Sequence, residues 1–185
     1  DVKPGMQDGT AGVKESDDEV PVVEFKNIAL KYSGAGDTSI AGVSFKAYRG
    51  QTIGIIGGTG SGKSSLVGLI PRFYDATEGE VLIDGVNVKD IKLEELRDKV
   101  GIVMQKAVLF KGSIRNNMQV AKQDATDGEI DEALAIAQAK EFVDKKDGRL
   151  DYMIEQGGKN LSGGQRQRLT IARAVVKKPD VLILD

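Results

Sequence analysis

A glycine-rich segment in the first third of the chain restricts the possible folds more than any other feature. It reads Gly57-Gly58-Thr59-Gly60-Ser61-Gly62-Lys63-Ser64 and fits the pattern G-x-x-x-x-G-K-[ST]. An apolar stretch, 51–56, precedes it, and KSSLVGLIPRF follows it. We expect a strand over 51–56, then a tight loop, then a helix that stops near Pro71, because proline cannot continue a helix.

The spacing of these glycines suits the binding of phosphate. Glycine lets consecutive backbone N–H groups turn toward phosphate oxygens, and the helix N-terminus adds a partial positive charge. Lys63 is expected to reach the terminal phosphates and the Ser64 hydroxyl to bind magnesium. The predicted binding segment therefore runs from Gly57 through Ser65, with a flexible glycine turn as the alternative.

Composition limits the function classes. A length of 185 residues suits one globular domain with a flexible arm, and a net charge of -2 gives no reason to expect nucleic acid as a partner. The chain has no cysteine and no histidine, so disulfides, thiolate metal sites and a histidine base are excluded. No apolar run approaches the roughly 20 residues that cross a bilayer. Any membrane role must come from docking to another component.

The pattern along the chain predicts its elements. Residues 1–20 are expected to form a flexible linker, and 21–185 a domain. Alternating residues predict antiparallel strands near 22–32 and 40–48, and Asp84-Gly85 predicts a hairpin over 80–88. A helix is expected over 93–100 and a strand over 101–104. The stretch 113–145 has helical periodicity, with Asp127 as its candidate cap, and a further helix is expected over 162–178.

Two later segments add chemistry. VLIL is expected to be a fully buried strand, and Asp185 at its carboxyl end is the candidate second magnesium contact, or else an ordinary strand-end aspartate. In 161–168, LSGGQRQR, Ser162 and two glycines begin a helix and predict a second anion-binding N-terminus. A plain capped helix would explain Ser162 but not Gly163 and Gly164, each of which costs about 1 kcal/mol in a helix.

The segment 161–168 resembles the signature of ABC proteins, and the likeness extends from Pro21 to the end. This resemblance implies an ATP-binding domain of an ABC transporter, of exporter type, with ATP hydrolase activity. The implied fold is α/β: a P-loop NTPase (RecA-like) core with an antiparallel β subdomain and an α-helical subdomain near 106–168. The implied cofactors are ATP and Mg2+, and the implied location is the cytoplasmic face of the cell membrane.

The resemblance also implies partners. The signature residues Ser162, Gly163, Gly164 and Gln165 are expected to close over ATP held by a second ABC ATP-binding domain, identical or homologous, in a head-to-tail dimer. A transmembrane domain is the other expected partner. Residues 106–118 resemble the exporter segment that faces it, and 154–157 resemble the exporter loop for cross-contact. A solvated polar surface is the alternative for both segments.

Further residues take roles from the same resemblance. Tyr32 matches the aromatic that stacks on adenine, with a core tyrosine as the alternative. Gln105 matches the glutamine that contacts magnesium and the attacking water. Lys63, Gln105 and Asp185 are therefore the expected catalytic residues.

The family's catalytic carboxylate directly follows the position of Asp185, where this chain stops, so we expect ATP binding without efficient turnover. The C-terminal part of the core is expected to be missing. The resemblance implies that a strand of this missing part lies between the strands over 52–56 and 181–184. Its absence would leave a gap in the sheet, which predicts an unstable or swapped fragment. A regulatory ABC domain that binds ATP without turnover, and an ABC ATPase acting on nucleic acid or ribosomes, stay open as alternatives.

Overall fold

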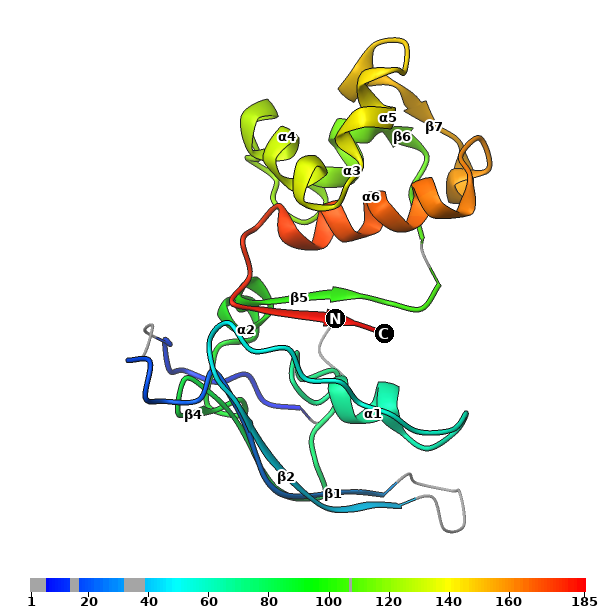
Figure 1. The fold of residues 1–185 in the computed structure, drawn as a ribbon. Coiled ribbons are helices and arrows are strands. Elements are labelled where there is room, and N and C mark those ends of the chain that lie inside the picture. Colours follow the sequence, from blue (N-terminus) through cyan, green and yellow to red (C-terminus); the bar gives the residue numbers. More distant parts are fainter. Residues whose placement is uncertain (1–5, 14–16, 32–38, 107) are drawn as a thin grey trace. The chain divides into compact units, whose positions relative to one another are not determined.

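The computed structural model describes residues 6–13, 17–31, 39–106 and 108–185. The chain divides into two compact units, Asp1–Val100 and Gly101–Asp185, and each is described by itself. Both units are drawn in Figure 1. Within the described residues, no helix has the length and apolar character needed to span a lipid bilayer.

The first unit is built on an antiparallel sheet of four strands in the order β2-β1-β3-β4. These strands are β1 (Val23–Lys31), β2 (Ser39–Ala47), β3 (Glu78–Ile83) and β4 (Val86–Asn87). The long strand β1 is central and pairs with both β2 and β3. The predicted antiparallel strands at the start of the domain are therefore confirmed.

The alternation along β1 shifts at a bulge. Val23 and Phe25 are buried, and Ile28 is buried three residues after Phe25 rather than two. Asn27 between them has a φ of 48°, and the register with both neighbouring strands shifts there. A bulge adds one residue to a strand and so returns the following side chains to the buried face.

The predicted hairpin over 80–88 is also confirmed. Asp84 and Gly85 connect β3 to β4 with φ values of 47° and 79°, as a two-residue turn with both residues left-handed requires. The Asp84 carboxylate is buried and lies 3.0 Å from Arg49 Nη2 and 3.5 Å from Lys99 Nζ. These two cations compensate the charge that the turn buries.

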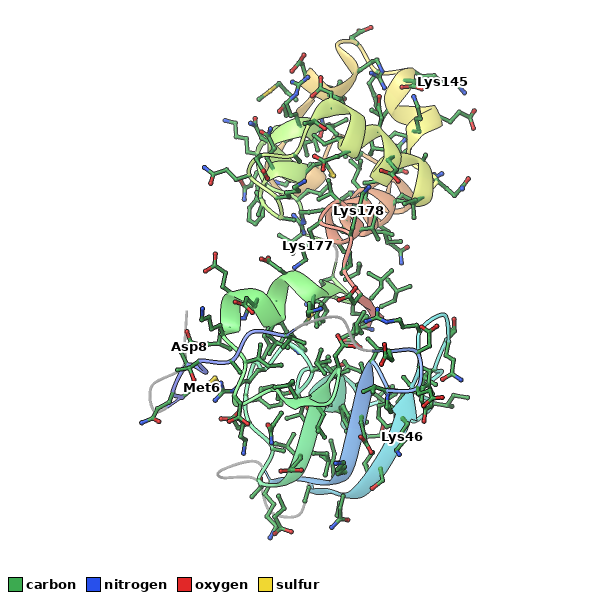
Figure 2. The ribbon with its side chains drawn as sticks, turned by 90° about the vertical axis from the view of Figure 1, so that its left-hand side faces the viewer. Met6, Asp8, Lys46, Lys145, Lys177 and Lys178 are labelled. Carbon is green, nitrogen blue, oxygen red and sulfur yellow. The ribbon has the colours of Figure 1, made fainter. Side chains whose placement is uncertain are left out.

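The N-terminal residues 6–13 bond to the start of α2 (Leu93–Lys99). The Leu93 amide donates to Asp8 Oδ1 at 2.8 Å, and Ala11 forms a parallel bridge with Ile91. Lys92, the N-cap residue, offers no side-chain cap to this helix. Asp8, which is labelled in Figure 2, therefore supplies an acceptor from elsewhere in the chain.

Two predictions around the glycine-rich segment are wrong. No strand forms over 51–56, where the exposed fractions of Ile53, Ile55 and Ile56 are 47%, 38% and 98%. A strand needs a hydrogen-bonded neighbour, and the sheet of this unit does not include these residues. The following helix, α1 (Lys63–Val67), is shorter than predicted, because it ends at Val67, with Gly68 as its C-cap residue, and not near Pro71.

The strand β5 (Val100–Val103) starts at the last residue of the first unit and continues into the second, where it pairs with β8 (Val181–Leu184) in a two-stranded sheet. The expectation that β8 is fully buried is wrong. Ile183 is buried, but Leu182 and Leu184 are 42% and 65% exposed. Among the described residues β8 pairs with β5 alone, so its side chains lack the second flanking strand that would help to enclose them in the centre of a sheet.

Helices form the rest of this unit around one apolar core that includes Leu109, Ile130, Leu134 and Leu169. The longest helix, α6, packs against α3 and α4, and it crosses below them in the view of Figure 1. The remaining elements are α3 (Ile114–Gln119), α4 (Asp127–Ile136), α5 (Lys140–Asp144), α6 (Gly163–Val175), the paired β6 (Gly112–Ser113) and β7 (Met153–Ile154), and the 3-10 turns η1 (Arg149–Asp151) and η2 (Gln156–Gly158).

The helical stretch predicted over 113–145 is divided into three helices. Ser113 caps α3 and Thr126 caps α4, each through a capping box. Asp127, the expected cap, is instead the first residue of α4. Gln138, with a φ of 55°, separates α4 from α5.

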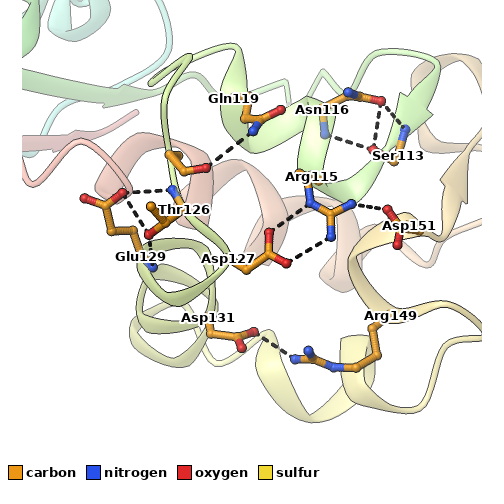
Figure 3. Close-up of polar contacts among 11 residues, drawn as sticks. Ser113, Arg115, Asn116, Gln119, Thr126, Asp127, Glu129, Asp131, Arg149 and Asp151 are labelled. Carbon is orange, nitrogen blue, oxygen red and sulfur yellow. Dashed lines mark hydrogen bonds and ion pairs between the residues drawn. The ribbon is translucent and has the colours of Figure 1, made fainter.

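Ion pairs join these short helices, as Figure 3 shows. The Arg115 guanidinium on α3 contacts Asp127 at 2.9 Å on α4 and also Asp151 in η1. Arg149 in η1 lies 2.8 Å from Asp131 on α4. Three elements that are distant in sequence are therefore linked by two arginines.

Candidate functional site

The glycine-rich loop of the first unit depends on two left-handed glycines. Gly60 and Gly62 have φ values of 78° and 88°, a region that L side chains rarely adopt. A Cβ at Gly62 would also lie 2.9 Å from Ile40 Cδ1. The loop therefore turns as the motif predicts and leads directly into α1.

Lys63 folds back over this loop. Its ammonium donates to the carbonyl oxygens of Gly57 at 2.6 Å and Gly58 at 2.8 Å, and it lies 3.3 Å from Ser61 Oγ. Behind it, the Tyr74 hydroxyl donates to the Ser65 carbonyl at 2.5 Å. The loop thus presents exposed backbone and one ammonium group on a long, flexible side chain. The start of α1 below it is held by the bond from Tyr74.

Gly58 has no structural requirement for glycine within the chain. Its φ is not left-handed, and a Cβ placed on it would meet no atom within 4 Å. The missing side chain leaves open space directly above the backbone of the loop. Such space is what a ligand that approaches the main chain needs.

The N-terminus of α6 has the same property. Ser162 caps the helix by accepting from the Gln165 amide at 3.2 Å, and Gln165 Oε1 accepts from the Ser162 amide at 3.1 Å. Ser162, Gly163 and Gly164 are all exposed. A Cβ at Gly164 would meet nothing within 4 Å, so packing inside the chain does not require glycine there either.

Gln105 and Asp185 lie in the second unit and line the same open pocket of about 520 Å³, together with Gly163 and Gln167. The Asp185 amide donates to Val103 O at 2.9 Å, so the pairing with β5 continues one residue beyond β8. Both predicted magnesium contacts of this unit are therefore at the carboxyl ends of β5 and β8. Their meeting with Ser64 at one metal ion stays a prediction, and Tyr32 lies outside the described residues.

The segments that resemble exporter contact regions are partly exposed. Val108 and Phe110 are 53% and 48% exposed on either side of the buried Leu109. The Leu109 carbonyl accepts from the Gly157 amide at 3.2 Å, which joins the segment 106–118 to the segment 154–157. No pattern in the sequence predicts this bond, because it joins two backbones and neither residue carries a polar side chain.

Two residues of this region were not predicted. Asn117 is 1% exposed, and its amide donates to the carbonyls of Phe110 and Ser113, both at 3.0 Å. Arg173 on α6 donates to the Val108 carbonyl at 2.8 Å. In the sequence, Asn117 could have been noticed only as a polar residue among the apolar residues that face the core from α3.

The oxygen groups present suit magnesium, because a hydroxyl, an amide and a carboxylate are hard ligands. The described part of the chain has no group of three or more histidine, cysteine, aspartate or glutamate side chains that could hold a metal ion. Magnesium would therefore depend on few protein ligands, which is usual where a bound polyphosphate supplies the others.

Comparison with known proteins gives a consistent result. A family model described as ABC transporter matches residues 40–185. The chain is 43% identical over 164 residues to the beta-(1→2)glucan export ATP-binding/permease protein NdvA of Rhodopseudomonas palustris, covering 89% of the chain and 27% of that protein. It is 41% identical over 186 residues to the ATP-dependent lipid A-core flippase of Haemophilus influenzae, covering 100% of the chain and 31% of that protein.

A solved structure of a bacterial Atm1-family ABC exporter with ATP bound is similar as well. It superposes with a TM-score of 0.83 at 34% identity, over 95% of this chain and 31% of that one. The chain thus spans less than a third of the length of these relatives.

Proposed function

Because this chain belongs to the ABC transporter family, whose domain model covers 40–185, we propose that it is the ATP-binding domain of an exporter. Its ATP binding and hydrolysis would drive the transport of a substrate by a transmembrane domain. The relatives are named as export proteins and a flippase, which supports a place at the cytoplasmic face of a membrane.

The open backbone at Gly58 carries the nucleotide part of this proposal. The loop keeps a glycine that its own packing does not need, beside a lysine whose ammonium already contacts the loop carbonyls. Phosphate oxygens would replace these carbonyls around Lys63 and accept from the loop N–H groups. Tyr32 is proposed to stack on the adenine.

The magnesium part rests on Ser64, Gln105 and Asp185. When bound, magnesium neutralises charge on the phosphates and favours attack by water. Ser64 and Asp185 are proposed to hold the ion, and Gln105 to contact it and to orient the water. Lys63 stabilises negative charge at the terminal phosphate.

The signature supports a pair of such domains. Gly164 is open and exposed at a capped helix N-terminus, so an anion from another molecule can approach its backbone. We place Ser162, Gly163, Gly164 and Gln165 against the ATP held by a second ABC domain, head to tail. The exposed Val108 and Phe110 are proposed to face the transmembrane partner.

Titration of the chain with a fluorescent ATP analogue tests the nucleotide site. Gly58→Ala and Lys63→Met should each weaken binding by about tenfold or more, because one blocks the backbone and the other removes a charged donor. Chelation of magnesium should weaken binding by the wild type as well.

Matched controls separate these effects from general damage. Gly54→Ala changes another exposed glycine with open space, and Lys46→Met changes another exposed lysine of the same unit. Both should bind as the wild type does. Equal affinities for all four variants, or no binding by the wild type, would contradict the proposal.

A further inference from the structure

Every residue of the segment Val108–Phe110 forms a hydrogen bond through its backbone to another part of the second unit. The Val108 carbonyl accepts from Arg173 Nη2 at 2.8 Å, and the next carbonyl along the chain, that of Leu109, accepts from the Gly157 amide at 3.2 Å. At the third residue, the amide donates to Asn117 Oδ1 at 2.9 Å and the carbonyl accepts from Asn117 Nδ2 at 3.0 Å. Hydrogen bonds from three different elements, α6, η2 and α3, therefore hold these three consecutive residues in place.

Arg173 is the unusual member of this set. Its guanidinium carbon lies 5.5 Å from the centroid of the Phe110 ring, so the charge is stacked on the segment that it also hydrogen-bonds. Its Nη1 is buried and has no hydrogen-bond partner within the described residues. Burial lowers the pKa of this guanidinium, which nevertheless remains charged.

Arg173 is half-buried, and the burial of its Nη1 without a hydrogen-bond partner among the described residues is costly. The contacts that compensate this cost in the structure are the Val108 carbonyl and the Phe110 ring. Both belong to the same short segment. The segment and the side chain therefore determine each other's position.

The segment also reaches the other end of α6. A Cβ at Gly158, whose φ is 70°, would lie 3.3 Å from Leu109 Cδ1 and 2.7 Å from Arg166 Cδ. Close packing there leaves no room for a side chain. Val108–Phe110 thus contacts α6 near its C-terminus, through Arg173, and the loop before its N-terminus, through Gly157 and Gly158.

We propose that Arg173 is a positioning residue that fixes Val108–Phe110 on α6, so that the segment after Gln105 and the loop before Ser162 move together. The hydrogen bonds and the ring contact carry the positioning claim by themselves. The functional consequence rests on the roles of Gln105 and Ser162 in the proposed function. The two parts are therefore tested separately.

Arg168 provides a matched comparison on the same helix. Its guanidinium carbon lies 5.4 Å from the centroid of the Phe142 ring, and its Nη1 donates to the Gln138 carbonyl at 3.0 Å. The type of contact is the same, but it joins α6 to the α4–α5 connection and α5. Arg168→Met therefore removes a similar arginine without touching Val108–Phe110.

Hydrogen exchange of the full chain without nucleotide tests the positioning. The Phe110 amide should exchange about tenfold faster in Arg173→Met than in the wild type, because the segment opens more often. Arg173→Lys, which keeps the charge, should restore part of the protection. Arg168→Met should leave the Phe110 amide unchanged, and amides within α4 should be unaffected by Arg173→Met.

Three results would overturn the positioning role. They are unchanged exchange at Phe110 in Arg173→Met, equal acceleration by Arg168→Met, and equal acceleration throughout α4. The last two would show that any arginine loss only loosens the unit. None of these measurements needs ATP, so they do not depend on the proposed function.

Addition of MgATP then tests the linkage. In the wild type, ATP should change the exchange of Phe110 and of Gly157–Gly158 with the same midpoint. In Arg173→Met the change at Gly157–Gly158 should fall by about tenfold while the affinity for a fluorescent ATP analogue stays within about twofold. An equal response in wild type and variant would overturn the linkage. Failure of the wild type to bind ATP would instead count against the proposed function.

Discussion

Gly164 and Gly128 occupy the same position in two helices, the second residue after the N-cap. Neither is required by packing, because a Cβ at Gly164 would meet no atom within 4 Å, and one at Gly128 would meet only Thr126 Oγ1, at 4.0 Å. Alanine at either position should raise the free energy of unfolding by roughly 0.5 to 1 kcal/mol. Urea unfolding measures this shared effect.

The two variants should differ in their pairing. If α6 closes over ATP held by a second copy, the methyl group of Gly164→Ala blocks the approach of phosphate, and MgATP-dependent association should weaken by about tenfold or more. Gly128→Ala should associate as the wild type does. Sedimentation velocity with MgATP distinguishes the two, and association of Gly164→Ala at wild-type strength would argue against the proposed pairing.

At the same scale, residues that belong to a local pattern were predictable from the sequence, and residues that depend on distant partners were not. Gly60, Gly62 and Ser162 follow from a motif or a cap, and the structure shows the expected turn and cap. Arg173 bonds to a carbonyl 65 residues away, which no pattern in the sequence reveals. Partners of this kind become visible only when the helices are packed.

At the scale of elements, the first turn of α4 carries two carboxylates with lowered pKa values, and one of them belongs to the capping box. Lys122 hydrogen-bonds the Glu129 carboxylate, and the Thr126 amide adds a second bond, so the pKa of Glu129 is lowered to about 2 from 4.5. Arg115 lowers the pKa of Asp127 in the same turn. These pairs connect the helix to its neighbours while leaving the carboxylates in contact with solvent.

The lowered pKa of Glu129 makes the stability of this unit depend on pH. Between pH 4.5 and 2 the unfolded chain takes up protons at Glu129 while the folded unit does not, so the free energy of unfolding falls as the pH falls. Glu129→Gln removes this group and should flatten the dependence in that range. Lys122→Met should flatten it too, because the pKa of Glu129 then rises toward its ordinary value.

Urea titrations at a series of pH values, followed by circular dichroism of the helices, measure this slope. A slope in Glu129→Gln as steep as in the wild type would show that the hydrogen bond to Lys122 does not persist in solution. The two variants together separate a loss of the carboxyl group from a loss of its partner.

Elements were predicted well where a local sequence pattern, such as a turn or a helical repeat, defines them. They were predicted poorly where the structure depends on whether another strand pairs with the segment. The hairpin at Asp84-Gly85 and α2 formed as expected. The predicted strand over 51–56 did not form, and β8 is more exposed than its apolar sequence suggests. Apolar content indicates that a segment can be buried, but hydrogen-bonded neighbours determine whether it becomes a strand.

At the scale of the whole molecule, each unit has an apolar core of its own. Ile28 is fully buried in the sheet unit, and Leu134 is fully buried in the helical unit. Truncation of a buried aliphatic side chain costs about 2 to 5 kcal/mol through lost packing and the remaining cavity. If the units unfold separately, each truncation should destabilise only the unit that contains it.

We therefore expect two urea transitions, one shifted by Ile28→Ala and the other by Leu134→Ala. Hydrogen exchange at increasing urea concentration follows them separately, through the amides of β1 for the first unit and of α6 for the second. Each variant serves as the control for the other, because both remove a buried aliphatic side chain. A single steep transition that both variants shift equally would mean that the two cores unfold as one cooperative domain. In that case the sheet and the helices would depend on each other for stability.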